Sequence, residues 1–218
     1  MYNKQNIVID VDDVLLNFRE HITDFITKEF SINYSKDNHG KIIYPNSQSW
    51  DLGEFFGLSE EQLKHLSSSL FTPTKCSENF FLNIKAIDGA KNFLSEIIKS
   101  KLYNIHYVTS IQKYNADYRI QNLKEQFDDI FNEKEQQVHC VGLNNSKSKI
   151  VSNLKPTSMI DDRFVNIYEC YPFIQNNMFW LDNGIREEKH NERFDEVNNS
   201  SCNLHTVDDY NKILETIL

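Results

Sequence analysis

The sequence predicts an α/β fold in which a mostly parallel, doubly wound sheet lies between two layers of helices. Short apolar stretches alternate with amphipathic helical stretches along most of the 218 residues, which is the pattern of βα units. Several of the apolar stretches end in carboxylate or hydroxyl side chains, and open α/β sheets bind ligands at the carboxyl ends of their strands. A chain of this length can bury a substantial core around such a sheet.

Five core strands are expected, each short and mostly apolar. They cover residues 6–11, 104–109, 137–141, 158–161 and 178–182. Helices are expected between and after them, at residues 88–100, 116–127, 147–154 and 207–217. The Asn-rich, charged segment 182–203 is expected to be irregular.

The first strand ends in the most informative segment of the chain. The β-branched residues 7–9 are followed by Asp10, Asp12 and Asp13, and burying three unpaired carboxylates is costly. Asp10 and Asp12 are two residues apart and would share a face of an extended strand. Crowded carboxylates need a cation, and Mg²⁺ prefers hard oxygen ligands. Asp is also common in turns, so this segment alone is consistent with either a metal site or a strand followed by an ordinary polar turn.

Polar side chains also follow the later strands. The second strand ends at Thr109 and Ser110, and the fourth ends at Asp161 and Asp162. A turn after the third strand leads to Lys147. Taken singly, helix capping or simple solvation explains each of these groups. Their order and placement together favour one site at the carboxyl edge of the sheet.

Two lysines compete for a place in that site. Ser146 is a plausible N-cap, which places Lys147 at the first helical position and directs it toward the sheet edge. Lys149 is two residues further on and points away from Lys147 on a helix. The sequence favours Lys147 and leaves Lys149 as the alternative.

A mostly helical insertion follows the first strand. From Phe18 onward, apolar residues recur at helical spacing, and Ser59 begins a capping box. No convincing buried strand is present between residues 17 and 85. The predicted division is an α/β core of residues 1–16 and 86–218 and a helical subdomain of residues 17–85, called the cap below.

Composition narrows the possible partners and location. The net charge of −9 argues against non-specific binding to nucleic acid. No apolar stretch is long enough to span a bilayer, and no signal peptide is visible, so a cytoplasmic protein without a membrane partner is expected. Reduced thiols are expected for the four cysteines, which are Cys76, Cys140, Cys170 and Cys202. The sequence leaves open whether the protein forms a homodimer.

In their order along the chain, these motifs resemble those of the haloacid dehalogenase-like (HAD) phosphohydrolases. The matching positions are Asp10, Asp12, Val14 and Leu15, then Thr109, then Lys147, and finally Asp161 with Asp162. The resemblance covers essentially the whole chain. It implies a three-layer, Rossmann-like core with a mostly parallel sheet and a cap inserted after the first strand.

Within that superfamily the chain is most similar to the 5′-deoxyribonucleotidases. The similar stretches are residues 10–18, 78–81, 87–90, 108–110 and 159–163. The chain departs from that group at Asp13, where glycine is usual, and the extra charge should change the local electrostatics. The resemblance implies a small phosphorylated substrate, a nucleoside monophosphate, with Phe18 placed to stack on its base. Phe80, Phe81 and Trp50 are further candidates, although aromatic residues at helical spacing are more often part of a core.

The resemblance also implies a mechanism. Asp10 attacks phosphorus and forms an aspartyl-phosphate, while Asp12 donates a proton to the leaving oxygen and later takes one from water. Thr109, Ser110 and Lys147 hold the phosphate oxygens.

The implied cofactor is Mg²⁺. Its ligands would be Asp10, the backbone carbonyl of Asp12, and Asp162, with Asp161 in support. Two other functions stay open: a phosphatase for another metabolite, such as a sugar phosphate, and a non-catalytic binding protein with the same fold. A phosphatase acting on nucleic-acid ends is disfavoured by the acidic charge.

Overall fold

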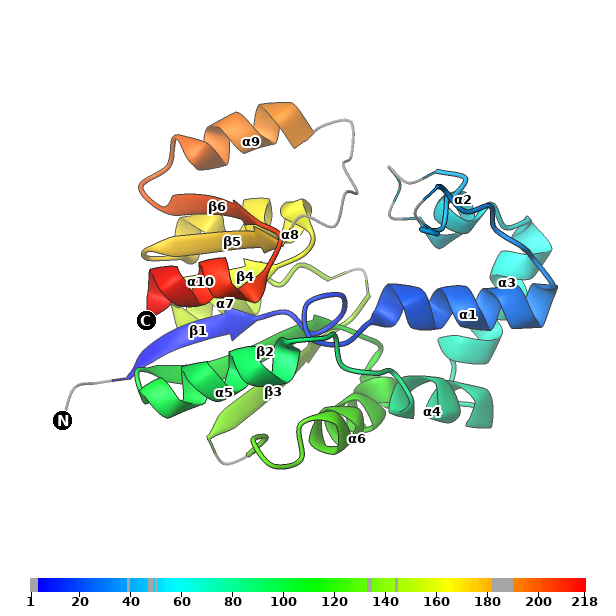
Figure 1. The fold of residues 1–218 in the computed structure, drawn as a ribbon, viewed down its shortest axis with the longest axis horizontal. Helices are drawn as coiled ribbons and strands as arrows, with labels where there is room; N and C mark the ends of the chain where they lie inside the picture. Colours follow the sequence, from blue (N-terminus) through cyan, green and yellow to red (C-terminus); the bar gives the residue numbers. More distant parts are fainter. Residues whose placement is uncertain are drawn as a thin grey trace.

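A six-stranded parallel sheet lies at the centre of the protein (Figure 1). The computed structural model describes residues 4–38, 40–46, 49, 51–132, 135–143, 145–181 and 190–218. In spatial order the strands are β3 (Gln136–Val141), β2 (Tyr103–Ser110), β1 (Gln5–Ile9), β4 (Ser158–Asp161), β5 (Asn177–Leu181) and β6 (Asn203–Val207). Every neighbouring pair is parallel. The predicted α/β class with a parallel sheet is therefore confirmed.

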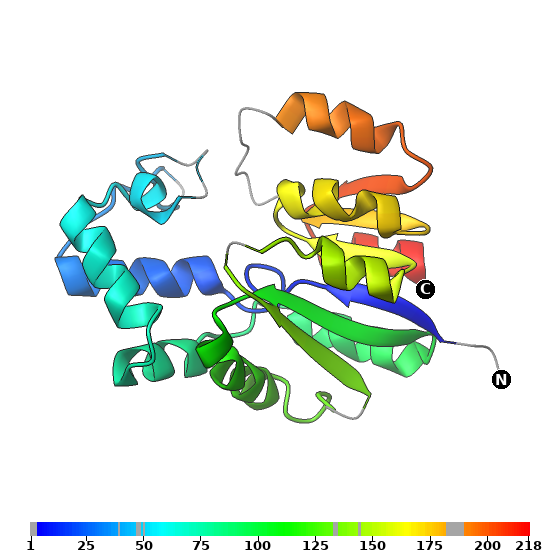
Figure 2. The same cartoon turned by 180° about the vertical axis from the view of Figure 1, so that it is seen from behind.

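Helices cover both faces of the sheet (Figures 1 and 2). One hydrophobic cluster contains Ile7 and Ile9 of β1 together with residues of α5 (Ala90–Ser100), α6 (Ala116–Gln126) and α10 (Tyr210–Ile217). The other contains Val8 together with residues of α7 (Ser148–Leu154), α8 (Phe164–Cys170) and α9 (His190–Asn198). This division follows from the strand, because successive side chains of β1 point to opposite faces. Short 3₁₀ turns occur at Lys113–Asn115 and Tyr171–Phe173.

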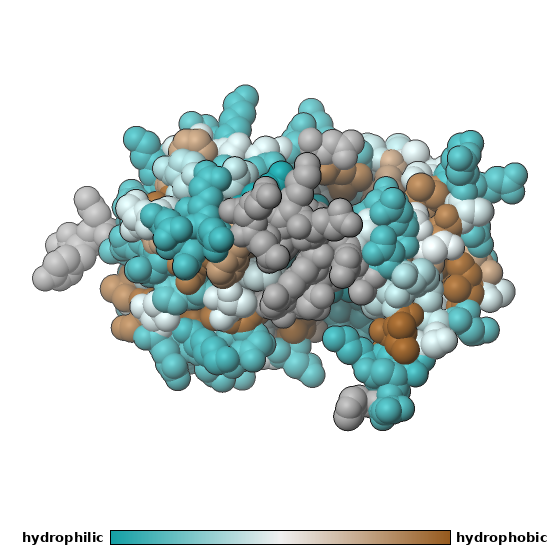
Figure 3. Space-filling model, turned by 90° about the horizontal axis from the view of Figure 1, so that it is seen from above, coloured by the Kyte–Doolittle hydropathy of each residue, from teal (hydrophilic) through white to brown (hydrophobic). Residues whose placement is uncertain are grey.

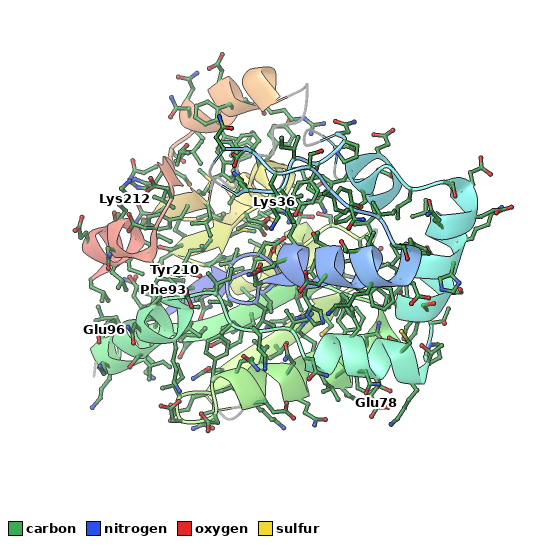
Figure 4. The ribbon with its side chains drawn as sticks, turned by 45° about the vertical axis from the view of Figure 1, so that its right-hand side comes forward. Lys36, Glu78, Phe93, Glu96, Tyr210 and Lys212 are labelled. Atoms are coloured by element: carbon green, nitrogen blue, oxygen red, sulfur yellow. The ribbon has the colours of Figure 1, made fainter. Side chains whose placement is uncertain are left out.

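On one face, α5 and α10 are joined by an aromatic pair. The rings of Phe93 and Tyr210 stack with their centroids 4.8 Å apart (Figure 4). The Tyr210 hydroxyl also donates to the carbonyl of Val14, so the C-terminal helix is fastened to the segment that follows β1. Gly89, the N-cap of α5, has a φ of 86°, in the left-handed region that glycine adopts readily.

The expectation that the segment 182–203 is irregular is wrong for part of its length. Residues 190–198 form α9, and its Phe194 and Val197 pack in the cluster on that face of the sheet. Only these few apolar residues stand among many polar ones, so the helical period was too weak to see in the sequence. Residues 182–189, including the end of the predicted fifth strand, lie outside the described residues.

Two other boundaries also differ from the expectation. The predicted last helix began at Val207, whereas Val207 ends β6 and α10 begins at Tyr210. This edge strand is short and partly exposed, which gives no continuous apolar run. The predicted N-cap Ser146 is one residue too early: α7 begins at Ser148 with Lys147 in the cap position. The Ser146 hydroxyl nevertheless accepts from the backbone amide of Ser148 at 3.0 Å.

The helices between β1 and α5 lie together beyond the carboxyl ends of the strands (Figures 1 and 2). They are α1 (Phe18–Phe30), α2 (Leu52–Phe56), α3 (Glu60–Leu70) and α4 (Lys75–Leu82). The capping box at the start of α3 is confirmed, because Ser59 and Gln62 each accept a hydrogen bond from the other's backbone amide. The cap therefore faces the edge of the sheet where the acidic motifs were expected.

The surface seen from above in Figure 3 is mainly hydrophilic, with hydrophobic residues in small groups between polar ones. Scattered apolar residues are ordinary on protein surfaces. No helix among the described residues is long and apolar enough to cross a membrane. All four cysteines are described, and none of them forms a disulfide.

Candidate active site

The acidic motif lies in a tight turn immediately after β1. The backbone amide of Asp10 still donates to the carbonyl of Ile160 at 2.9 Å, but the chain then leaves the sheet. Asp13 has a φ of 56°, a conformation that Asp and Asn adopt more readily than most non-glycine residues. Asp10 and Asp12 therefore do not share a face of one extended strand, as the sequence suggested. The Asp10 carboxylate contacts Lys147, whereas the Asp12 carboxylate contacts Arg119.

Three carboxylates converge at this edge of the sheet. Asp10, Asp161 and Asp162 each place a carboxylate oxygen within 4.8 Å of the others, and all three residues are buried. Lys147 lies among them with its Nζ 2.8 Å from Asp10 Oδ1 and 2.7 Å from Asp161 Oδ2. The structure thus brings together the ends of β1 and β4 and the start of α7, as the order of the motifs predicts.

Burial disfavours the ionised forms of Asp10 and Asp162. It raises the pKa of Asp10 to about 7, against the attraction of Lys147 and with the help of the charges on Asp161 and Asp12. The pKa of Asp162 is also well above its usual value, because of burial and repulsion from Asp13 and Asp10. Burial alone would lower the pKa of Lys147, but Asp10 and Asp161 more than offset this and raise it. One buried ammonium does not compensate the negative charge that collects here.

The donor set fits a hard divalent cation. All three groups offer carboxylate oxygens, which Mg²⁺ prefers over nitrogen or sulfur ligands. The Asp161 carboxylate is already well occupied, since Oδ1 accepts from Asn166 Nδ2 and the Arg163 amide, each at 2.9 Å, and Oδ2 accepts from Lys147. Asp10 and Asp162 are therefore better placed to bind an ion than Asp161.

The Asp12 carboxylate is held apart from this cluster. Its Oδ2 accepts from the Thr109 hydroxyl at 3.0 Å, and its Oδ1 lies 2.6 Å from Nη2 of Arg119. The Asp12 side chain is 22% exposed, while the side chain of Arg119 is fully buried. Asp12 thus combines two fixed contacts on the protein side with partial access to solvent.

Asp13 and Arg19 form a second ion pair at the entrance to the cap. The Asp13 carboxylate accepts from the backbone amide of Arg19 at 2.8 Å and pairs with Arg19 Nη2 at 3.2 Å. The same guanidinium nitrogen lies 3.5 Å from Asp162 Oδ2. Burial raises the pKa of Asp13, and Arg19 opposes that shift. Arg19 therefore compensates part of the charge that Asp13 adds beside the carboxylate cluster.

A cavity of about 640 Å³ separates the cluster from the cap. Asp10, Asp12, Asp162 and Ser110 line it on the core side. The cap side is mostly apolar and includes Phe18, Leu52, Leu63 and Phe71. This volume is typical of small-molecule sites. Most of the polar lining groups lie at the end with the carboxylates, and Asp51 and Ser67 add polar groups on the cap side.

The predicted site residues take several different positions. Ser110 lines the cavity, whereas Thr109 is fully buried and directs its hydroxyl to Asp12. Phe18 lines the cavity and packs edge-to-face on Phe80, with centroids 5.9 Å apart. Lys149 is exposed, in contrast to the buried Lys147.

Of the further aromatic candidates, Phe81 lines the cavity and both Phe80 and Phe81 are buried in the core. Trp50 lies outside the described residues.

Sequence reasoning missed Arg19, Arg119 and Asn166. Arg119 lies on α6 between Asn115 and Asn122, and all three side chains are buried. Polar residues at this helical spacing usually form a solvated face, so the sequence carried no sign that these are internal. Arg19 and Asn166 each lie a few residues after an acidic motif, the first after Asp13 and the second after Asp162. Neither belongs to a sequence pattern that would have marked it as part of the site.

No protein-family model matches the chain, and no curated protein matches it. Solved structures do match its fold. A proposed phosphatase from Clostridium difficile has 16% identity and a TM-score of 0.60, with all of both chains covered. A HAD family hydrolase from Deinococcus radiodurans, solved with phosphate and sodium, has 10% identity and a TM-score of 0.56, with 98% of this chain and 95% of that chain covered.

A third similar structure is a proposed HAD-hydrolase from Bacillus subtilis bound to magnesium. It has 12% identity and a TM-score of 0.54, and 99% of each chain is covered. Identities this low establish the fold and nothing finer. The chain has the fold of HAD-family hydrolases over essentially its whole length.

Proposed function

We propose that this protein is a Mg²⁺-dependent phosphomonoester hydrolase of the HAD-like superfamily that works through an aspartyl-phosphate on Asp10. The observation that carries the proposal is the buried cluster of Asp10, Asp161 and Asp162 around Lys147. Two of its members, Asp10 and Asp162, line one end of the cavity. Its fold, shared with HAD-family hydrolases, agrees with this class of reaction.

Asp10 and Asp162, with the backbone carbonyl of Asp12, would hold the ion. When bound, Mg²⁺ supplies positive charge that neutralises the carboxylates and the phosphate oxygens. Lys147 already contributes one positive charge at Asp10, and it stays protonated because its carboxylate partners raise its pKa. These positive charges reduce the electrostatic repulsion between the Asp10 carboxylate and the anionic phosphate that it attacks.

In the proposed reaction the Asp10 carboxylate attacks phosphorus, and the ester bond to the leaving oxygen breaks. Asp12 gives its proton to that oxygen. Water then attacks the phosphorus of the aspartyl-phosphate, and Asp12 takes the proton from the water as phosphate leaves. Lys147 and Ser110 orient the phosphate oxygens. Thr109 is fully buried and donates its hydroxyl to Asp12, so it acts on the reaction through Asp12.

We propose a deoxyribonucleoside or ribonucleoside 5′-monophosphate as the substrate. The apolar lining from the cap, in which Phe18 and Phe71 present aromatic surface, suits a flat base. The cavity volume of about 640 Å³ is large enough for a molecule of this size. A cytoplasmic location, predicted from the sequence, belongs to the same proposal.

A phosphate-release screen with Mg²⁺ tests this proposal. The panel contains nucleoside 5′-monophosphates, nucleoside 3′-monophosphates and sugar phosphates, and Asp10→Asn serves as the inactive control. Faster release from the 5′-nucleotides supports the nucleotidase assignment. Faster release from sugar phosphates would replace the substrate and keep the reaction, and no release from any of these esters would overturn the phosphatase.

A further inference from the structure

Arg119 is an unusual residue in the interior of this protein. Its side chain is fully buried, and its Nη2 lies 2.6 Å from Oδ1 of Asp12. Its Nε and Nη1 are also buried and make no hydrogen bond. A buried guanidinium with unpaired donors is a poor source of stability, because desolvation is not fully repaid. Its contact with Asp12 is therefore the feature that needs an explanation.

The surroundings of Arg119 leave it little freedom. It lies on α6 between Asn115 and Asn122, and these two asparagines donate to backbone carbonyls of the cap segments. The guanidinium also lies over the ring of Phe81 in α4, with its carbon 5.5 Å from the ring centroid. α6 is therefore fixed to the base of the cap on both sides of Arg119, so the guanidinium has a set position relative to Asp12.

Asp12 is the group that most needs such a fixed position. In the proposed function its carboxyl must reach the leaving oxygen in one step and a water in the next. One carboxylate oxygen is held by Thr109 and the other by Arg119, while the 22% of the side chain that is exposed lies at the cavity. Two contacts of this kind determine both the position of the carboxyl group and its rotation.

We propose that Arg119 is a positioning residue that holds the carboxyl group of Asp12 toward the leaving oxygen. This inference rests on the proposed function and adds a residue that the motifs do not contain. Arg119 does not line the cavity, and the reacting group that it contacts is Asp12. Its effect on the reaction passes through Asp12 alone, which gives it a distinctive kinetic signature.

That signature is a dependence on the leaving group. A nucleoside 5′-monophosphate releases an alkoxide, which must take the proton of Asp12 as the ester bond breaks. p-Nitrophenyl phosphate releases a weakly basic phenolate, which leaves without that proton. The value of kcat/KM reports on the reaction up to release of the first product, so the later attack of water does not obscure the comparison.

The experiment measures kcat/KM of Arg119→Gln on both esters with Mg²⁺. We expect a loss of about 10-fold to 100-fold on the nucleotide, the scale of general acid catalysis, and a loss of no more than about threefold on p-nitrophenyl phosphate. Arg119→Lys, which keeps a positive charge on a flexible side chain, should recover part of the loss on the nucleotide. Equal losses on the two esters, or no loss on either, would overturn the positioning role.

Asn122→Ala is the matched control. Asn122 is on the same helix and is also fully buried, but it bonds the carbonyls of Leu82 and Ile84 instead of Asp12. This variant should lower the melting temperature while leaving the ratio of the two kcat/KM values unchanged. A changed ratio in Asn122→Ala would mean that general loosening of α6 produces the signature, and would overturn the assignment to Arg119.

A failure of the proposed function gives a different result. In that case the wild-type protein hydrolyses neither ester, whatever happens at Arg119. Crystal structures of wild type and Arg119→Gln then decide the inference. A rotated Asp12 carboxyl group in the variant supports the positioning role, and an unchanged Asp12 contradicts it.

Discussion

Two clusters of polar side chains lie on the same sheet, and burial affects them in different ways. At the carboxyl edge, Asp10 and its neighbours surround Lys147. On the face formed by β2 and β3, His106 Nδ1 lies 3.2 Å from His139 Nε2, and His106 Nε2 lies 3.3 Å from Asn6 Oδ1. Burial favours the neutral form in both places: it raises the pKa of Asp10 to about 7 and lowers the pKa of His106 to about 4.

The difference is in how each cluster becomes neutral. His106 is neutral above its lowered pKa, and both of its ring nitrogens then have hydrogen-bond partners within the protein. The carboxylate cluster has more negative charge than Lys147 and Arg19 compensate, so it needs protons or a bound cation. We infer that the histidine cluster is a satisfied structural network and that the carboxylate cluster is a binding site.

Removing the proposed nucleophile from the carboxylate cluster should have the largest effect. Asp10→Asn should lower phosphate release at least about 1,000-fold, as expected when a covalent nucleophile is lost. Because the variant removes a buried carboxylate whose charge is unfavourable, its circular dichroism spectrum should remain that of the folded protein. Near-normal turnover in Asp10→Asn would show that Asp10 is not the nucleophile.

The two lysines test whether position within the cluster matters. Lys147→Ala should lower the rate at least 100-fold, on the order of 3 kcal/mol, the scale of losing one preorganised electrostatic group. Lys149→Ala should be close to neutral, because Lys149 is an exposed surface residue. The measurement is kcat for both variants at saturating Mg²⁺, and a larger loss for Lys149→Ala would refute the assignment.

Metal binding should distinguish the carboxylate cluster by stability as well as by activity. EDTA should remove activity, and Mg²⁺ at about 100 times its dissociation constant should stabilise the fold by about 2.7 kcal/mol. Acid protonates Asp10, whose pKa is raised to about 7, so the stabilisation should be smaller at about pH 5.5 than at about pH 8. Thermal denaturation with and without Mg²⁺ measures both effects.

Asp162→Asn is the control for that titration. It removes a proposed ligand and one buried charge, so the Mg²⁺-dependent rise in melting temperature should disappear while the metal-free protein becomes no less stable. An undiminished rise in Asp162→Asn would place the ion elsewhere.

The histidine cluster should also lose stability on acidification, but over a lower pH range and without any dependence on Mg²⁺. The pKa of His106 is lowered to about 4 in the folded protein, so between about pH 6.5 and pH 4 the unfolded chain binds more protons there and acid destabilises the fold. The loss at His106 amounts to at most about 3 kcal/mol. Burial also lowers the pKa of His139, which therefore acts in the same direction. The charged residues Lys4 and Glu135 line a groove together with His106.

Urea unfolding of His106→Gln as a function of pH measures this term. The variant should lose less stability than the wild type on acidification, with or without Mg²⁺. An identical loss in both proteins would mean that His106 does not retain its lowered pKa.

The core and its motifs could be predicted from the sequence because each depends on a local pattern. A short apolar run that ends in Asp10 or Asp161 marks both the strand and the edge where its ligands collect. The capping box of Ser59 and Gln62 is equally local. Placing Lys147 among the carboxylates needed only the start of α7 to within one residue.

The parts that were missed depend on packing between distant elements. Arg119 contacts Asp12, which is 107 residues away in the sequence. The polar residues around Arg119 in α6 predict a solvent-exposed position instead. The role of Arg19 depends on the position of α1 beside Asp162, which the sequence does not reveal. In α9, Val197 is buried, yet the surrounding polar residues hide the helical period. Local periodicity carries no information about such contacts.

An aspartyl-phosphate on Asp10 can be detected by locating the phosphoryl group during turnover. The protein is mixed with Mg²⁺ and the best substrate from the screen, quenched in acid, digested and analysed by tandem mass spectrometry. We expect a hydroxylamine-sensitive phosphoryl group on Asp10, absent from Asp10→Asn. A phosphoryl group on another residue, or full turnover with none on Asp10 at any quench time, would contradict it.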